Sequence, residues 1–377
     1  MESLFWVSAF FVLYPYAGYP LLLWLLGLVR EKPAPPAEAP DWPALTLLIA
    51  AYNEEAVIRE KLENSLALDY PPEKLEIVVA SESTDRTNEI VEGYRGRGVK
   101  LYAFRQRRGK PALLYATVPL VRGEIVVFSD ANALYEPPAL RKLARHFADP
   151  RLGCVSGQLV YGGGTGAAAA SEPLYWRYEQ WLKRLESRLG ALVGANGSIF
   201  ALRKSLYAPL SETRGDDFEL PVRVLLQGYR AILEPDARSH EPGSPSVQAE
   251  FCRRVRIVSW FLESTWILLK EAGRRRQGRL AVQLVSHRLL RWAAPLFLLV
   301  LVGSSAAAGG DFYRAALGLQ LAFYGAALLG WLLEARGASL PVLLRLPYYF
   351  CALHLAVLVG LRRGLSSPGL AAWEKVR

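Results

Sequence analysis

The stretch GEIVVFSDAN, residues 123–132, contains the pattern that decides the fold. Its apolar run, Ile125 to Phe128, is short and continuous, which is typical of a strand buried on both faces. The run is followed at once by a carboxylate, Asp130, and an amide, Asn132. Both are also common turn residues. On its own, this stretch therefore fits either a plain turn or a binding site at the tip of a buried strand.

Similar apolar runs precede this strand, and helix-like segments separate them. The runs LTLLIA at 45–50 and LEIVV at 75–79 have the same buried character. Strands that alternate with helices predict an α/β fold, namely a parallel-rich, Rossmann-like sheet with helices on both faces. Strands are expected at 45–50, 75–79, 99–104 and 125–128. Helices are expected at 54–66 and 112–121, and a further helix should begin after an N-cap at Thr84 or Asp85.

Polar clusters follow three of these strands. They are YNEE at 52–55, SESTD at 81–85 and SDAN at 129–132. In open α/β sheets, ligands bind beyond the carboxyl ends of the strands. We therefore expect the three clusters to converge on one crevice.

The two ends of the chain are apolar enough to enter a membrane. Residues 4–29 carry no charge, and roughly 20 apolar residues cross a bilayer. Segments 289–309 and 312–333 are further spans, while 346–361 is short and fits either a span or a re-entrant helix. The predicted divisions are an N-terminal transmembrane helix (1–30), a linker (31–44), an α/β domain (45–250), amphipathic interface helices (251–288), transmembrane helices (289–361) and a tail (362–377).

Basic residues indicate the orientation and the partners. The net charge is +10, and basic residues cluster beside the spans on the side of the α/β domain. The positive-inside rule then places that domain in the cytoplasm, on a multi-pass protein of the cell membrane. Charges in this position suit anionic lipid headgroups or an anionic substrate better than nucleic acid. The three cysteines lack metal-ligand spacing and imply no disulfide framework.

Several common catalytic and nucleotide-binding motifs are absent, which argues against the enzyme classes that use them. No G-x-G-x-x-G follows the first strand, and the chain has no G-x-S-x-G elbow, H-E-x-x-H or P-loop. The glycine-rich segment 161–170 is expected to be a loop, either a lid or a linker. Dinucleotide-dependent oxidoreductases, α/β-hydrolases, zinc proteases of this type and P-loop NTPases are therefore disfavoured.

The motifs that are present form an ordered set: AYNEE, STDRT, RRGK, SDAN, GANG, DDF and RRVRI. This order resembles the inverting, membrane-bound glycosyltransferases of family 2, which include cellulose, chitin and hyaluronan synthases and smaller bacterial members that make polysaccharides or glycolipids. The resemblance covers roughly residues 45–260 and the arrangement of spans. It implies a GT-A fold that binds a nucleotide-diphospho-sugar.

The resemblance also implies a metal and donor site. Asp130 and Asn132 stand at the family's D-x-D position, where they would hold Mg²⁺ or Mn²⁺ against a diphosphate. Asn132 keeps an oxygen but lacks the usual charge, and His240 is a candidate third ligand. Ser81 stands where the family usually has an Asp that reads the base, and Glu82 is a candidate replacement. The remaining donor-binding candidates are Ala51, Tyr52, Glu54, Asp85, Lys110 and Arg253.

The catalytic candidates come from DDF and RRVRI. A sugar hydroxyl must lose its proton as it attacks, and Asp217 matches the family's general base. Asp216 remains an alternative, and two acids at a helix start also suit the helix dipole. Arg256 would neutralise the leaving diphosphate, and Ile257 replaces the usual Trp. A basic amphipathic helix at 251–271, lying on anionic lipid, is compatible with this role.

The expected function is metal-dependent transfer of a sugar, by default from a UDP-sugar, to a polysaccharide or lipid acceptor. Asn196 and Gly197 of the GANG motif are expected on the acceptor side. One alternative is a single-sugar glycolipid synthase that acts on diacylglycerol or ceramide. A second alternative, from another class, is a catalytically dead membrane scaffold that binds nucleotide-sugars.

Overall fold

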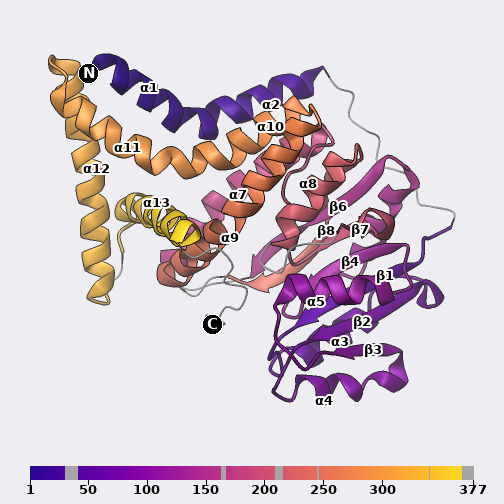
Figure 1. Cartoon of the computed structure of the whole chain (residues 1–377). Helices are drawn as coiled ribbons and strands as arrows, with labels where there is room; N and C mark the ends of the chain where they lie inside the picture. Colours follow the sequence, from indigo (N-terminus) through magenta and orange to yellow (C-terminus); the bar gives the residue numbers. More distant parts are fainter. Residues whose placement is uncertain (30–40, 163–166, 209–214, 244–245, 339, 367–377) are drawn as a thin grey trace.

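The computed structural model describes residues 1–29, 41–162, 167–208, 215–243, 246–338 and 340–366 (Figure 1). Outside these residues lie most of the predicted linker, part of the glycine-rich segment, Arg214 before the DDF motif and most of the C-terminal tail. The described chain forms an α/β domain next to a group of long helices.

A mixed sheet of eight strands forms the centre of the α/β domain, in the order β3-β2-β1-β4-β7-β6-β8-β5. The first four strands along the chain are parallel to one another, as predicted. Beyond β4 the sheet continues through antiparallel pairs of β4 with β7, β7 with β6, and β8 with β5. The strands are β1 Leu45–Ala51, β2 Leu75–Ser81, β3 Val99–Ala103, β4 Ile125–Asp130, β5 Leu134–Tyr135, β6 Leu152–Gly162, β7 Phe200–Arg203 and β8 Arg230–Pro242.

Helices cover both faces of the sheet, and the alternation of side chains along β1 explains why. Leu47 and Ile49 pack into one core with helices α3, α4 and α6, whereas Leu48 packs into a second core with α5 and α8. A strand buried on both faces needs apolar residues throughout, which is the pattern of LTLLIA. These helices are α3 Ile58–Leu66, α4 Thr87–Glu92, α5 Lys110–Thr117, α6 Ala139–Ala144 and α8 Asp216–Leu226.

The expected helix boundaries shift at the strand tips. Helix α3 begins at Ile58 rather than at residue 54, because the Glu54 carbonyl accepts hydrogen bonds from the N–H groups of Val57 and Ile58 in a turn. Helix α4 begins at Thr87, and Asp85 accepts the Thr87 N–H at 3.0 Å instead of capping an earlier start. The polar clusters therefore form turns that precede the helices.

Among the described residues, four helices are long and apolar enough to cross a membrane, judged by length and composition. The second extends over Gly278–Ala307, so the predicted interface region 251–288 ends earlier than expected. The last, α13, is a continuous helix from Val342 to Ser366. Two of the spans contain a π-helical turn, at Tyr14–Gly18 and at Val285–Leu289. The helices are α1 Glu2–Leu13, α2 Tyr19–Leu28, α10 Gly278–Leu284, α11 Leu290–Ala307, α12 Asp311–Ala335 and α13.

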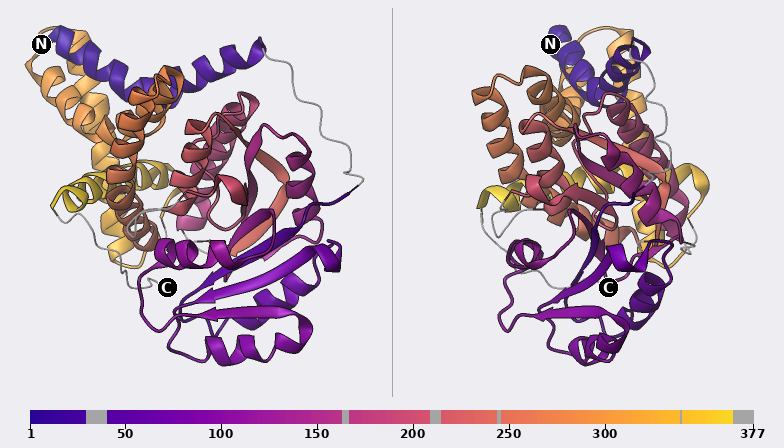
Figure 2. Two further views of the ribbon diagram at one scale, coloured as in Figure 1. Left: turned by 45° about the vertical axis from the view of Figure 1, so that its right-hand side comes forward. Right: turned by 90° about the vertical axis from the view of Figure 1, so that its right-hand side faces the viewer.

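Helix α9, Val247–Arg274, links the α/β domain to these helices (Figure 2). The rings of Phe218 in α8 and Phe261 in α9 stack with centroids 5.1 Å apart. Gly215 permits this contact, since a Cβ atom there would lie 2.1 Å from Phe261 Cε1. On its other side, α9 packs against Gly360 of α13, where a Cβ atom would lie 2.8 Å from Val258 Cβ.

The backbone approach at Gly123 supplies a test of the packing before β4. A Cβ atom at Gly123 would lie 2.4 Å from the Thr46 nitrogen, which is backbone and cannot move aside. Gly123→Ala should therefore destabilise the fold by about 1–3 kcal/mol, measured as a lower melting temperature in detergent. Gly96→Ala is the control, because nothing lies within 4 Å of its Cβ position. Equal melting temperatures for the two variants would contradict this packing.

Candidate active site

The turns after β1 and β2 are joined by hydrogen bonds. Asn53, which has a positive φ of 52°, donates its N–H to Ser83 Oγ at 2.9 Å. Its side-chain oxygen accepts the Thr84 N–H at 2.8 Å. The Glu54 N–H bonds Thr87 Oγ1 at 2.8 Å, and the Glu55 N–H bonds Asp85 Oδ2 at 3.2 Å. Two of the three predicted clusters are thus joined into one rim at the carboxyl ends of β1 and β2.

Glu82 has a different role from the one expected for it. Its carboxylate accepts the N–H groups of Arg108 and Gly109, both at 3.0 Å, and so holds the loop before α5. Ser81 is fully buried and bonded to Ser83, and the Ala51 carbonyl accepts the Glu82 N–H. These three residues shape the rim from inside. At its surface, the Arg107 guanidinium lies 4.0 Å from the Tyr52 ring centroid.

Lys110, the first residue of α5, brings three distant motifs together. Its Nζ lies 2.8 Å from Asp130 Oδ1 at the end of β4 and 3.3 Å from Asp216 Oδ2 at the start of α8. Burial lowers the pKa of Lys110, but Asp130 and Asp216 outweigh burial and hold it above its ordinary value. The ammonium therefore stays charged, and it joins RRGK, SDAN and DDF in one cluster.

The two acids of DDF have different surroundings. Asp216 is only 5% exposed, and burial raises its pKa to about 6, with Asp217 and Asp130 adding to the effect. Asp217 is partly exposed and lies beside the GANG loop, where a Cβ atom on Gly197 would be 3.4 Å from Asp217 Oδ2. The Asp217 carbonyl also accepts the Ala195 N–H at 2.8 Å. Of the two, Asp217 is the one accessible to a substrate.

Helix α9 presents two arginines to the same cluster. Burial and Arg253 lower the pKa of Arg256, while Asp130, Glu250 and Asp217 oppose that shift. Arg256 is therefore within electrostatic reach of both Asp130 and Asp217. Arg253 lies 3.4 Å from Glu250 Oε2 and 5.7 Å from the Tyr161 ring centroid.

His240 is engaged elsewhere, contrary to its prediction as a metal ligand. Its Nε2 lies 3.2 Å from Glu136 Oε1. Within the described parts of the chain, no three His, Cys, Asp or Glu side chains are grouped closely enough to form a metal site. Of the predicted ligands, Asp130 and Asn132 remain.

Residues 46–208 match the family described as Glycosyl transferase family 2. The chain carries a family 2 glycosyltransferase domain.

Relatives and solved structures agree with this domain. Beta-monoglucosyldiacylglycerol synthase of Synechocystis sp. is 28% identical over 318 residues, covering 77% of this chain and 65% of that protein. Poly-beta-1,6-N-acetyl-D-glucosamine synthase of Staphylococcus aureus is 24% identical over 238 residues, covering 58% and 57%. The chain thus spans from 57% to 65% of the length of these relatives.

A mannosyltransferase from Pyrobaculum calidifontis, solved in complex with GDP-Man and Mn²⁺, has a TM-score of 0.74 and 25% identity. The match covers 97% of this chain and 100% of that chain. It confirms the predicted GT-A fold.

The GANG loop of the family 2 domain is held by protein contacts. Lys183 in α7, Ala167–Arg188, donates to Asn196 Oδ1 at 2.5 Å and to the Ala195 carbonyl at 3.1 Å. The Asn196 amide in turn donates to the Gly157 carbonyl. Asn196 was expected to face the acceptor, but both ends of its side chain bond to the protein. Gly197 is the residue of this loop beside Asp217.

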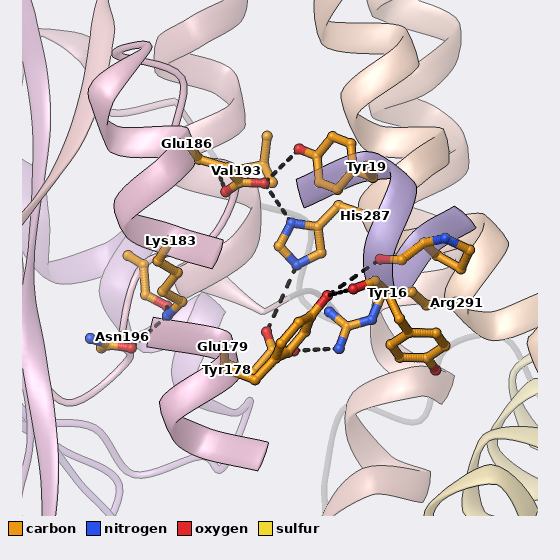
Figure 3. Close-up of polar contacts among 12 residues, drawn as sticks. Tyr16, Tyr19, Tyr178, Glu179, Lys183, Glu186, Val193, Asn196, His287 and Arg291 are labelled. Carbon is orange, nitrogen blue, oxygen red and sulfur yellow. Dashed lines mark hydrogen bonds and ion pairs between the residues drawn. The ribbon is translucent and has the colours of Figure 1, made fainter. Parts of the chain in front are cut away.

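A polar junction, formed by Tyr19, Glu179, Glu186, His287 and Arg291, joins α7 to two apolar helices (Figure 3). Glu186 Oε1 accepts the Tyr19 hydroxyl at 2.8 Å and lies 2.6 Å from His287 Nδ1. Glu179 pairs with Arg291, and His287 Nε2 lies 3.9 Å from Glu179 Oε2. Sequence reasoning missed this junction, although the seven-residue spacing of the two acids places them on one helix face.

The raised pKa of Asp216 predicts a pH-dependent cost to the fold. The pKa is about 6 in the folded protein against an ordinary 3.8, so between these values the folded state binds more protons than the unfolded state. Stability then falls as pH rises through this window. Asp216→Asn should therefore be about 1–3 kcal/mol more stable than wild type at pH 7.5, and the gain should vanish near pH 4. Melting temperatures at both pH values check this.

The matched control is Glu60→Gln on the exposed surface of α3, whose effect should be small at both pH values. A melting temperature of Asp216→Asn that falls below wild type at pH 7.5 would show that the pairing with Lys110 outweighs the burial cost.

The polar junction should be essential for stability. Glu186→Ala leaves the buried Tyr19 hydroxyl and His287 without their shared acceptor, and each buried polar group left unsatisfied costs about 1–3 kcal/mol. We expect a large fall in melting temperature in detergent. Glu60→Ala is the exposed control, and a similar melting temperature for both variants would refute the structural role of the junction.

Proposed function

We propose that this chain is a membrane-integrated, inverting glycosyltransferase that moves a sugar from a nucleotide-diphospho-sugar to a hydroxyl of a lipid or polysaccharide. The observation that carries the proposal is the cluster around Lys110. It gathers a carboxylate for a metal-diphosphate site, an accessible acid and a cationic helix beyond the carboxyl ends of the parallel strands. Such a cluster in a family 2 domain matches the requirements of sugar transfer.

The donor would lie along the rim formed by the turns after β1 and β2. The Tyr52 ring and the Arg107 guanidinium offer a flat, cationic surface to a nucleotide. Glu54 and Asp85 act indirectly, because they hold the turns that form the rim. The base is open: a UDP-sugar is the default expectation, whereas the mannosyltransferase relative was solved with GDP-Man.

The oxygen ligands available at the site fit Mg²⁺ or Mn²⁺. Lys110 occupies Asp130 Oδ1 at 2.8 Å, which leaves Oδ2 for an ion, and Asn132 adds an amide oxygen. Asp130 and Asn132 would hold the metal, which when bound neutralises charge on the diphosphate.

Asp217 is the proposed general base. It takes the proton of the acceptor hydroxyl as that oxygen bonds to the anomeric carbon and the bond from this carbon to the diphosphate breaks. One in-line displacement inverts the configuration. Asp216 is less suited, because it is buried beside Lys110. Lys110 and Arg256 stabilise the leaving diphosphate, and Arg253 supports the same region from the next turn of α9.

The acceptor side faces the apolar helices. We place the protein in the cell membrane with the glycosyltransferase domain in the cytoplasm, from the basic residues beside the spans and the four apolar helices. Ile257 in place of Trp and the similarity to a diacylglycerol-modifying relative favour a single addition to a lipid. The similarity to a poly-N-acetylglucosamine synthase favours a polymer.

The test is release of nucleoside diphosphate by the full chain from a panel of UDP- and GDP-sugars with Mg²⁺ or Mn²⁺ and lipid extract. Asp217→Asn and Asp130→Ala should each lose about 10²–10⁴-fold in rate, while Glu60→Gln stays at wild-type rate. Mass analysis of the product separates one added sugar from a ladder. If wild type releases no diphosphate from any donor, the alternative of a nucleotide-sugar-binding scaffold is favoured. If wild type is active and Asp217→Asn matches it, Asp217 is not the general base.

A further inference from the structure

Strand β8 places a second carboxylate beside the SDAN turn. In the antiparallel pair of β5 and β8, Leu134 lies opposite His240 and Tyr135 opposite Ser239. Continuing this register places Glu241 opposite Ala133, the residue after Asn132. Side chains alternate between the faces of a strand. His240 turns to Glu136 on one face, so Glu241 faces the other side, as Tyr135 does.

The surroundings of Glu241 are charged, and they leave it unsatisfied. Its Oε1 atom is buried and has no hydrogen-bond partner among the described residues. The charged groups around Glu241 are the Asp130 carboxylate and the cationic side chains of Arg253, Lys110 and Lys61. A buried acceptor without a partner is costly. A cation between Glu241 Oε1 and the Asp130 carboxylate would reduce this cost.

The lysine nearest the turn is committed to other groups. Lys61 is fully buried in α3, donates to the Ala133 carbonyl at 2.5 Å and lies 3.9 Å from the Tyr135 ring centroid. It therefore holds the backbone of the turn between Asp130 and β5. Neither Lys61 nor any other described side chain donates a hydrogen bond to Glu241 Oε1, so a bound cation would satisfy this oxygen.

We propose that Glu241 supplies the second negative charge of the divalent-metal site, in place of the carboxylate that Asn132 lacks. Asp130 then approaches the ion from the end of β4 and Glu241 from β8, with Asn132 between them on the turn. This inference rests on the proposed function for the presence of a metal, but its test needs no sugar transfer.

The experiment measures Mn²⁺ binding to the full chain in detergent by electron paramagnetic resonance, with UDP or GDP and no donor sugar. Glu241→Gln should weaken Mn²⁺ binding by about tenfold or more. Asn132→Asp should tighten it, and the double variant Asn132→Asp/Glu241→Gln should return to within about threefold of wild type, because the lost charge is restored on the other side. Glu136→Gln, on the opposite face of the same strand pair, is the matched control and should bind as wild type.

Two outcomes would overturn the inference. In the first, Glu241→Gln binds Mn²⁺ within about twofold of wild type, whereas Asp130→Ala loses Mn²⁺ binding. This result would leave the proposed function intact. The second is a lower melting temperature of Glu241→Gln than of wild type in EDTA, which indicates a structural role. Conversely, Glu241-dependent Mn²⁺ binding in a protein that transfers no sugar would support the metal site and overturn the proposed function.

Discussion

The ammonium of Lys110 lies between two carboxylates that come from opposite ends of the domain, Asp130 after β4 and Asp216 at the start of α8. A partly buried charge persists only when it is paired, so these elements are held together by the same cation. Its own position depends on the preceding loop, which Glu82 fixes through two backbone N–H groups. The strand tip, the RRGK loop and the DDF helix are consequently arranged as one unit.

The same unit is connected to the apolar helices. Helix α8 carries Phe218, which stacks on Phe261 of α9. The Arg288 guanidinium, from the second span, lies 4.3 Å and 5.0 Å from the centroids of these two rings. The polar junction adds a charged contact between α7 and the spans, and Glu186 also accepts the Val193 N–H at the start of the GANG region. A shift of the long apolar helices would therefore reach Asp217 through packed side chains.

The cluster carries acids in unfavourable places. Burial raises the pKa of Asp216 to about 6 and that of Glu241 to about 7. Asp216 lies beside Lys110, whereas Glu241 has an oxygen without a hydrogen-bond partner among the described residues. Groups perturbed in this way concentrate at functional sites, where binding of a ligand repays the cost of burial. A divalent cation bound together with the anionic donor would relieve the repulsion among these carboxylates.

The sequence by itself determined the parallel half of the sheet, because a strand buried on both faces is apolar at nearly every position. IVVF is apolar throughout, and LTLLIA and LEIVV are apolar except at Thr46 and Glu76, which bond to each other. The apolar spans and the order of the motifs were also legible in the sequence, since each depends on composition or local spacing. Only the tertiary structure decided the other half, from β5 to β8, where antiparallel pairs and the parallel β6–β8 pair join segments that lie far apart in the chain. It also decided which face of the sheet each of two neighbouring residues occupies. His240 and Glu241 are adjacent, and strand register alone turns the histidine toward Glu136 and the glutamate toward the turn. The motifs of Glu82 and Asn196 were recognisable in the sequence and led us to expect ligand contacts. Their hydrogen-bond partners within the protein could not be predicted, because they come from segments that only the folded chain brings close.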